Sequence, residues 1–152
     1  MPHIHELYDF VTSVYIVHDS KVLLVNHPRY GKWIPIGGHV ELDETPEDAL
    51  YREIEEETGL KVKILNNEPV LNSHIDGFIT TPRFMHVHPA NPPHQHIALI
   101  YFAKSQNDKF IKSDEHTEGR WFSDKELDNP KYNISEQVKF TAREALKAAT
   151  II

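Results

Sequence analysis

The 152-residue chain contains no cysteine, which excludes disulfide bonds, thiolate metal sites and cysteine nucleophiles. It also lacks a long hydrophobic run, because the longest one, Ile97 to Ala103, is far too short to cross a bilayer. Its first residues lack the apolar segment of a secretory signal peptide. From these absences we expect a cytoplasmic protein that spans no membrane and has no membrane partner.

Basic residues are few as well. The chain has 16 Lys and Arg against 23 Asp and Glu, which gives a formal net charge of −7. Between Glu41 and Glu57 there are nine acids and one base, so this segment carries −8 and the other 135 residues about +1. Without basic clusters the chain lacks the side chains that bind phosphate backbones. We therefore expect no nucleic-acid polymer as a partner.

The order of sequence patterns predicts one mixed α/β domain over residues 1–152, long enough to bury a core without covalent staples. A proline- and glycine-rich stretch at 27–38 predicts a loop with one or two short strands. Runs rich in β-branched, aromatic or aliphatic residues predict strands at 10–18, 21–26, 61–65, 70–78, 84–88, 97–103 and 119–123. Apolar residues at helical spacing after Ser135 predict a closing amphipathic helix.

A second helix is predicted from Pro46 to Thr58. Thr45 is a suitable N-cap, Pro46 fits the first helical position, and Asp48 completes a capping box. Gly59 fits the left-handed position after the last turn. The helix therefore coincides with most of the acidic segment.

The acids of this helix are placed against its dipole, because its C-terminal half already presents partial negative charge. At about 100° per residue, Glu53, Glu56 and Glu57 share one face, and Arg52 lies one turn before Glu56. A solvated acidic face would normally interleave Lys with Glu, and this one does not. A bound cation explains the stripe better, and oxygen ligands favour Mg²⁺, Mn²⁺ or Ca²⁺ over Zn²⁺. The Gly37-Gly38 pair before the helix would allow a close backbone approach or a sharp turn.

The segment from Gly38 to Leu60 resembles the complete signature of the Nudix hydrolases, G-x5-E-x7-R-E-U-x-E-E-x-G-U, where U is a bulky aliphatic residue. All nine specified positions match. They are Gly38, Glu44, Arg52, Glu53, Ile54, Glu56, Glu57, Gly59 and Leu60. The lead-in from Trp33 is also similar, although Ile36 stands where the family usually has proline. The resemblance implies an α/β/α sandwich with a mixed central sheet.

The resemblance further implies hydrolysis of a nucleoside diphosphate linked to another moiety, by substitution of water at phosphorus with Mg²⁺ or Mn²⁺ as cofactor. It makes Glu56 and Glu57 direct metal ligands, Glu53 a further ligand or the general base, and the Gly38 carbonyl a completing ligand. Arg52 would orient these groups, and Glu44 would act through water or support the helix start. In many relatives an acid before the last strand is the base; Glu115 and Glu118 are the candidates, and we choose Glu118.

The resemblance implies a small nucleotide as the substrate, and its identity stays open at this stage. Signatures of nicotinamide-dinucleotide, coenzyme A and ADP-ribose hydrolases are absent, which leaves a nucleoside triphosphate or a modified nucleotide as the default. Arg29 and Lys32, before the glycine pair, are candidates for substrate binding, although a plain exposed loop explains them equally well. A homodimer is a further expectation, since relatives often dimerise.

Two other interpretations remain. The chain could be a non-catalytic, nucleotide-sensing Nudix module, but its intact acids argue against this. Alternatively, the eleven histidines include two pairs, His86/His88 and His94/His96, that could each face one side of a strand and bind Zn²⁺ or Fe²⁺. Prolines in the region, and the lack of a nearby Asp or Glu in the sequence, argue against such a site.

Overall fold

The computed structural model describes residues 5–29, 31–65, 77–111, 113–114, 116 and 118–151. The elements are β1 Tyr8–His18, β2 Lys21–His27, β3 Lys32–Ile34, β4 Ile36–His39, α1 Pro46–Thr58, β5 Val62–Ile64, β6 Phe84–Pro89, β7 Gln95–Ser105, β8 Glu118–Ser123 and α2 Glu136–Thr150, with short 3₁₀ turns at Glu126–Asp128 and Pro130–Tyr132. They match the predicted order closely. The strand predicted at 70–78 falls almost entirely outside the described residues.

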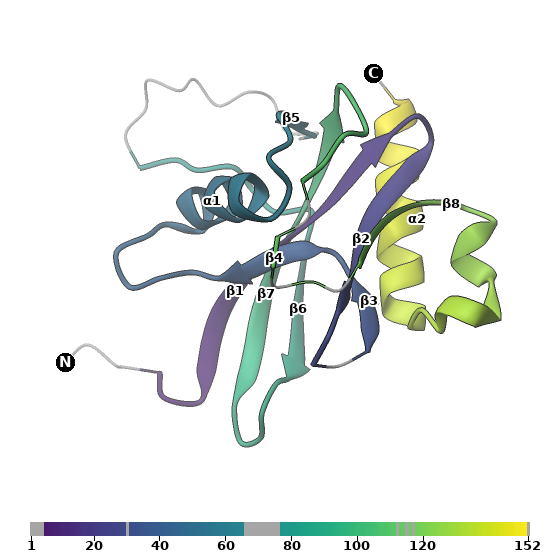
Figure 1. Ribbon diagram of the computed structural model, residues 1–152. Coiled ribbons are helices and arrows are strands. Elements are labelled where there is room, and N and C mark those ends of the chain that lie inside the picture. The colour runs from purple at the N-terminus through teal and green to yellow at the C-terminus, as the bar shows by residue number, and fades with distance from the viewer. Residues whose placement is uncertain are drawn as a thin grey trace.

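The strands form one mixed sheet around β1 (Figure 1). One edge of β1 pairs in parallel with β7 along nearly its whole length. The other edge is shared, because the C-terminal end of β1 pairs with β2 and its N-terminal half pairs with β4. Since β6 lies antiparallel on the far side of β7, the order at the N-terminal end of β1 is β4–β1–β7–β6. That end of the sheet carries the sites described below.

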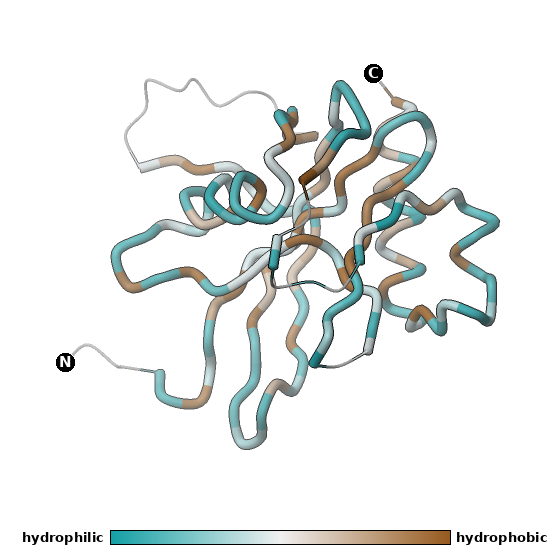
Figure 2. The backbone as a smooth tube through the Cα atoms, viewed as in Figure 1, coloured by the Kyte–Doolittle hydropathy of each residue, from teal (hydrophilic) through white to brown (hydrophobic). Residues whose placement is uncertain are grey.

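A helix covers each face of the sheet, which confirms the predicted α/β/α sandwich (Figure 1). On one face, α1 buries Leu50 and Ile54 against residues such as Val14 of β1. On the other, α2 buries its alanine-rich side against residues such as Tyr15 and Phe102. Figure 2 shows the hydrophobic stretches along the central strands and the hydrophilic ones in the outer loops. Of the helices among the described residues, none is long and apolar enough to cross a membrane.

The local sequence fixes both ends of α1. The Thr45 hydroxyl accepts a hydrogen bond from the Asp48 amide at 3.1 Å, and the Asp48 carboxylate accepts one from the Thr45 amide at 3.0 Å. At the other end Gly59 adopts a left-handed conformation, with φ of 65°. The predicted bounds of Pro46 and Thr58 are confirmed.

Candidate active site

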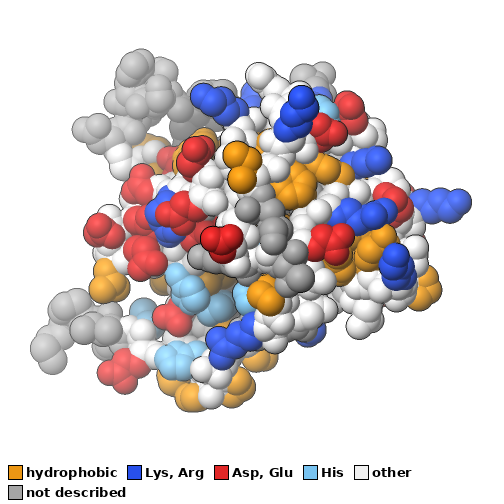
Figure 3. Space-filling view, viewed as in Figure 1, with side chains coloured by type: hydrophobic (Ala, Val, Ile, Leu, Met, Phe, Trp, Pro, Cys, Tyr) orange, Lys and Arg blue, Asp and Glu red, His pale blue; other side chains and the backbone are white. Residues whose placement is uncertain are grey.

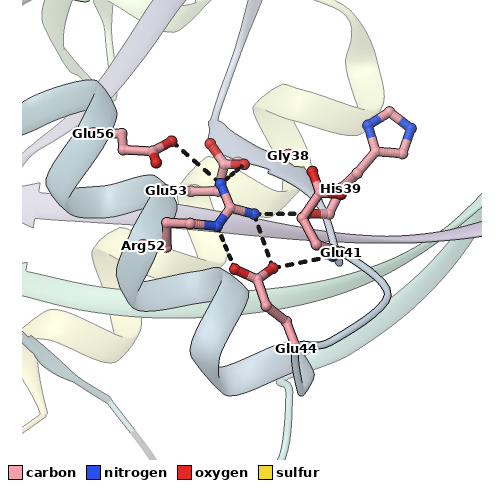
Figure 4. A pocket seen from close by; sticks show the side chains of 8 residues that line it. Gly38, His39, Glu41, Glu44, Arg52, Glu53 and Glu56 are labelled. Atoms are coloured by element: carbon pink, nitrogen blue, oxygen red, sulfur yellow. Dashed lines mark hydrogen bonds and ion pairs between the residues drawn. The ribbon is translucent and has the colours of Figure 1, made fainter.

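Acidic side chains gather over α1 and the loop before it on the face shown in Figure 3. Between this helix and β4 lies a pocket of about 510 Å³, within the usual range for small-molecule sites. Its lining contains four carboxyl side chains and one guanidinium: Gly37, Gly38, His39, Glu41, Glu44, Arg52, Glu53 and Glu56 (Figure 4). The pocket thus collects Gly38, Arg52 and all the acids that the sequence motif singles out except Glu57.

The glycine pair allows close packing, not a sharp turn. Both residues lie in β4, paired with Ser13 and Thr12 of β1, and neither has a positive φ. A Cβ on Gly37 would overlap the Thr12 carbonyl oxygen, and a Cβ on Gly38 would overlap the Glu53 carboxyl group. Gly38 is therefore the position that lets the Glu53 carboxylate lie directly against the strand.

Arg52 organises the acids around it. Its Nε and Nη2 donate to the two carboxylate oxygens of Glu44, the second at 3.0 Å. Its Nη1 donates to Glu53 Oε1 at 2.8 Å and to Glu56 Oε2 at 3.2 Å, the last being the contact that the helical spacing predicts. Nη2 also donates to the His39 carbonyl at 3.0 Å and so ties the helix to β4. One planar guanidinium thereby sets the positions of three carboxylates.

Glu44 serves to hold Arg52 and the loop before the helix. Both of its oxygens accept from Arg52, and Oε2 also accepts from the Glu41 amide at 3.0 Å. The hydrogen bond from Arg52 is the main reason that the pKa of Glu44 is lowered. Of the two roles considered for Glu44, this geometry fits support of the helix start.

Glu53 is a carboxyl group in an unfavourable place for negative charge. Its side chain is only 11% exposed. Its pKa is raised to about 7, chiefly by burial and also by the neighbouring Glu57 carboxylate, while the hydrogen bond from Arg52 opposes both. A carboxyl group with a pKa near neutrality in a pocket is typical of a catalytic base or of a cation ligand that lacks its cation.

The side chains of Glu56 and Glu57 lie in different environments, one exposed and one buried. Glu56 lines the pocket with its side chain 58% exposed. Glu57 is 3% exposed and does not line the pocket, and its Oε2 lies 2.9 Å from Nε2 of the equally buried His116. Sequence reasoning missed His116. The sequence analysis considered the loop around His116 only for its two candidate bases, Glu115 and Glu118. The position of His116 between these two acids is the one feature of the sequence that could have indicated a role for it.

Comparison with known proteins settles the family. The family model described as NUDIX domain matches residues 8–143. The chain belongs to the Nudix family. A solved structure of a hydrolase of the NUDIX family from Clostridium perfringens is 33% identical, with a TM-score of 0.84, and the match covers 93% of this chain and 97% of that one. The sequence signature and the α/β/α fold are thus both confirmed.

Curated Nudix relatives match over shorter stretches. The CTP pyrophosphohydrolase of Escherichia coli is 32% identical over 98 residues, which are 60% of this chain and 73% of that protein. A MutT-like protein from Streptomyces ambofaciens is 41% identical over 54 residues, or 36% of this chain, and the chain spans only 35% of the length of that relative.

Nudix proteins generally use a divalent cation, and the donors in this pocket fit one. Glu53 and Glu56 offer carboxylate oxygens, and Gly38 lines the same pocket. An oxygen-only donor set suits Mg²⁺ or Mn²⁺. The raised pKa of Glu53 also fits, because a buried carboxylate gains most from a nearby positive charge. The Glu57 carboxylate has one oxygen against His116 and also lies beside Glu53, and its expected role as a metal ligand stays a prediction.

The other predicted site residues lie elsewhere. Glu118 is the exposed first residue of β8, opposite Asn26, and does not line the pocket. Arg29 and Lys32 are exposed at the connection between β2 and β3, and they do not line it either. Glu115 lies outside the described residues. The roles expected for these residues in catalysis and substrate binding stay predictions.

Proposed function

We propose that this Nudix protein is a pyrophosphohydrolase that cleaves a phosphoric anhydride bond of a nucleoside triphosphate or modified nucleotide, with Mg²⁺ or Mn²⁺ as its cofactor. The observation that carries this proposal is the arrangement of Glu53 and Glu56 around Arg52, beside Gly38, in one open pocket. A bare nucleotide is an anion and would be repelled by these acids. A bound cation would both occupy the carboxylates and neutralise charge on the phosphate oxygens.

The residues of the chain have separate tasks in this mechanism. Glu56 and the Gly38 carbonyl would hold the cation, with Glu53 either as a further ligand or as the general base, and Arg52 would keep the two carboxylates in place. The oxygen of a water molecule forms a bond to phosphorus, and the bond from phosphorus to the bridging oxygen breaks, so that the leaving phosphate carries away the electron pair. As the general base instead of a ligand, Glu53 would accept the proton released by that water, since its carboxylate lines the same pocket.

The name of one relative supports a nucleoside triphosphate as the substrate class. The Escherichia coli relative of which this chain covers 73% is named a CTP pyrophosphohydrolase. The pocket volume of about 510 Å³ is of the size that holds a small molecule. The remaining alternative, a nucleotide sensor without turnover, would need no ordered set of carboxylates around Arg52.

The test is a screen of nucleoside tri- and diphosphate derivatives for Mg²⁺-dependent release of phosphate, with inorganic pyrophosphatase added so that pyrophosphate is also detected. Binding is measured in parallel by thermal shift. We expect turnover of at least one nucleotide, abolished by EDTA. Tight binding of a nucleotide without turnover of any would favour the sensor, and turnover that survives EDTA would contradict the proposed mechanism.

Gly38→Ala is expected to lower turnover by about 10-fold or more, because the added Cβ displaces the Glu53 carboxyl group while the strand itself stays paired. Gly37→Ala is the informative comparison, since its Cβ meets the Thr12 backbone and should lower the stability of the fold instead. Steady-state kinetics and thermal unfolding of both variants separate the two effects. Equal kinetic and stability losses in the two variants would contradict the assigned contacts.

Arg52→Lys is expected to lower kcat by roughly 10- to 100-fold, because an ammonium group is a point charge and cannot bond Glu44, Glu53 and the His39 carbonyl at once. The measurement is kcat at saturating Mg²⁺, with circular dichroism as the check on folding. If the variant keeps its activity within about threefold, Arg52 does not position the acids through its planar geometry.

The expectations of a homodimer and of a cytoplasmic location remain part of the proposal. Light scattering after gel filtration measures the first. A mass of one chain at all concentrations would contradict it.

A further inference from the structure

Histidine side chains gather next to the acidic pocket on the surface in Figure 3. They belong to the end of the sheet where β4, β1, β7 and β6 lie in consecutive order. Gly38 faces α1, so the next residue, His39, faces the opposite side of the sheet, and Figure 4 shows its ring turned away from the carboxylates. The His39 ring therefore lies apart from the carboxylates, although the His39 carbonyl bonds Arg52 in the acidic pocket. We call His39, His86, His88, His94 and His96 the histidine group.

The strand register brings an acid into this group. Asp9 of β1 lies opposite His96 of β7, and His96 lies opposite His88 of β6. His39 of β4 pairs with Val11, two residues along β1 and on the same face as Asp9. In the sequence no Asp or Glu lies near the histidine pairs, and from this we expected that no acid would complete a ligand set. That expectation is wrong. Parallel pairing of β1 with β7 supplies Asp9 from the other end of the chain.

The ligand atoms of Asp9, His39 and His96 all lie within 4.8 Å of one another. The rings of His39 and His96 are perpendicular, with centroids 4.9 Å apart. Ligands at about 2.1 Å from a tetrahedral metal are about 3.4 Å apart, so the three atoms would have to approach one another by at most about 1.4 Å. Asp9 and His39 have the exposure that such an approach needs.

Two further histidines lie beside these three residues. The ring of His88 is 5.1 Å from that of His96, centroid to centroid. The Nδ1 of His94 is buried, has no hydrogen-bond partner among the described residues, and lies 3.9 Å from Asp9 Oδ2. Burial lowers the pKa of both His88 and His96, and neighbouring histidines lower it further. Neutral imidazole is the form that binds a metal.

We propose that Asp9, His39 and His96 form a second cation site, which binds a transition metal such as Zn²⁺, with His88 or His94 available as a fourth ligand. Two imidazoles and one carboxylate select Zn²⁺ over Mg²⁺, whereas the oxygen-only pocket on the other side of β4 has the opposite preference. A metal here connects β4, β1 and β7, so that it also stabilises the strand that carries Gly37 and Gly38.

The test is a calorimetric titration with Zn²⁺ in the presence of excess Mg²⁺, which occupies the acidic pocket. We expect one tightly bound Zn²⁺ per chain, and at least tenfold weaker binding in His96→Gln and in Asp9→Asn. The matched controls are His18→Gln, since His18 lies at the far end of β1 with its ring hydrogen-bonded to Ser105, and Glu56→Gln in the acidic pocket. Both controls should bind Zn²⁺ as the unmodified protein does.

Three results would overturn the proposal: no saturable Zn²⁺ binding, unchanged affinity in His96→Gln, or loss of binding in Glu56→Gln but not in His96→Gln. Co²⁺ gives an independent readout, because its visible absorption is strong in a tetrahedral site and weak in an octahedral one, and this chain has no thiol that could contribute. That absorption should appear in the unmodified protein and be lost in His96→Gln, whose folding is checked by circular dichroism.

Discussion

Glu56→Gln is expected to lower Mg²⁺-dependent turnover by at least about 100-fold and to leave the fold and its stability nearly unchanged. The side chain is 58% exposed and bonds Arg52 at 3.2 Å, so its removal costs the structure little. The loss of a charged oxygen donor from the pocket, by contrast, removes a proposed cation ligand. The measurement is kcat over a range of Mg²⁺ concentrations, together with thermal unfolding of the metal-free protein.

Glu55→Gln is the matched control for this prediction. It removes the same charge from the next residue of α1, but Glu55 does not line the acidic pocket. Its turnover should stay within about twofold of the unmodified protein. Equal losses in the two variants would mean that the total charge of the helix, rather than a ligand at position 56, controls the rate. Unchanged turnover in Glu56→Gln would remove the metal site from this helix.

Glu53→Gln is expected to have opposite effects on activity and stability. Turnover should fall by roughly 100- to 1,000-fold, because the amide neither accepts the proton of the attacking water nor binds a cation with a full charge. At pH 8 without metal, however, the variant should be more stable than the unmodified protein. Such a trade-off is expected where a carboxylate is kept in an unfavourable place for function.

The sign of the stability effect follows from the pKa of Glu53, which rises from 4.5 to about 7 on folding. Between these pH values the folded protein keeps a proton that the unfolded chain has released. The stability from this group is therefore fully present below about pH 4.5 and is lost as the pH rises through about 7. The expected loss in the free energy of unfolding is of order 1–3 kcal/mol.

Denaturant unfolding in EDTA at pH 5 and pH 8 measures this effect in the unmodified protein and in Glu53→Gln. The unmodified protein should lose more stability between the two pH values than the variant does, and Glu55→Gln should behave as the unmodified protein. Added Mg²⁺ should restore stability at pH 8 only where Glu53 is present, because binding to the folded state alone stabilises it. A Glu53→Gln variant that is less stable than the unmodified protein at pH 8 would contradict the pKa assignment.

The sequence predicts α1 and its pocket well because their determinants are local. The cap at Thr45, the stop at Gly59 and the spacing from Arg52 to Glu56 all act within a few turns of one helix. A helical repeat translates such spacing directly into a shared face. The motif then adds Gly38, whose contact with Glu53 bridges only the short loop between β4 and α1.

Contacts between residues far apart in the chain could not be predicted from the sequence. Asp9 meets His96 only because β1 pairs in parallel with β7 in one register, and a slip of a single residue would turn Asp9 to the other face. Glu57 meets His116 because the loop before β8 returns to α1. The helical spacing correctly predicted that Glu57 lies beside Glu53. It could not predict that the buried His116 contacts the Glu57 carboxylate.

The central claim, that the acidic pocket cleaves a phosphoric anhydride by attack of water at phosphorus, is tested most directly by hydrolysis in ¹⁸O-labelled water. The substrate is the nucleotide that the screen selects, and the products are analysed by mass spectrometry with Mg²⁺ and with EDTA. We predict one labelled oxygen on a phosphate of one product, formed only with Mg²⁺. Products without label on phosphorus, or labelled products formed equally well in EDTA, would contradict the claim.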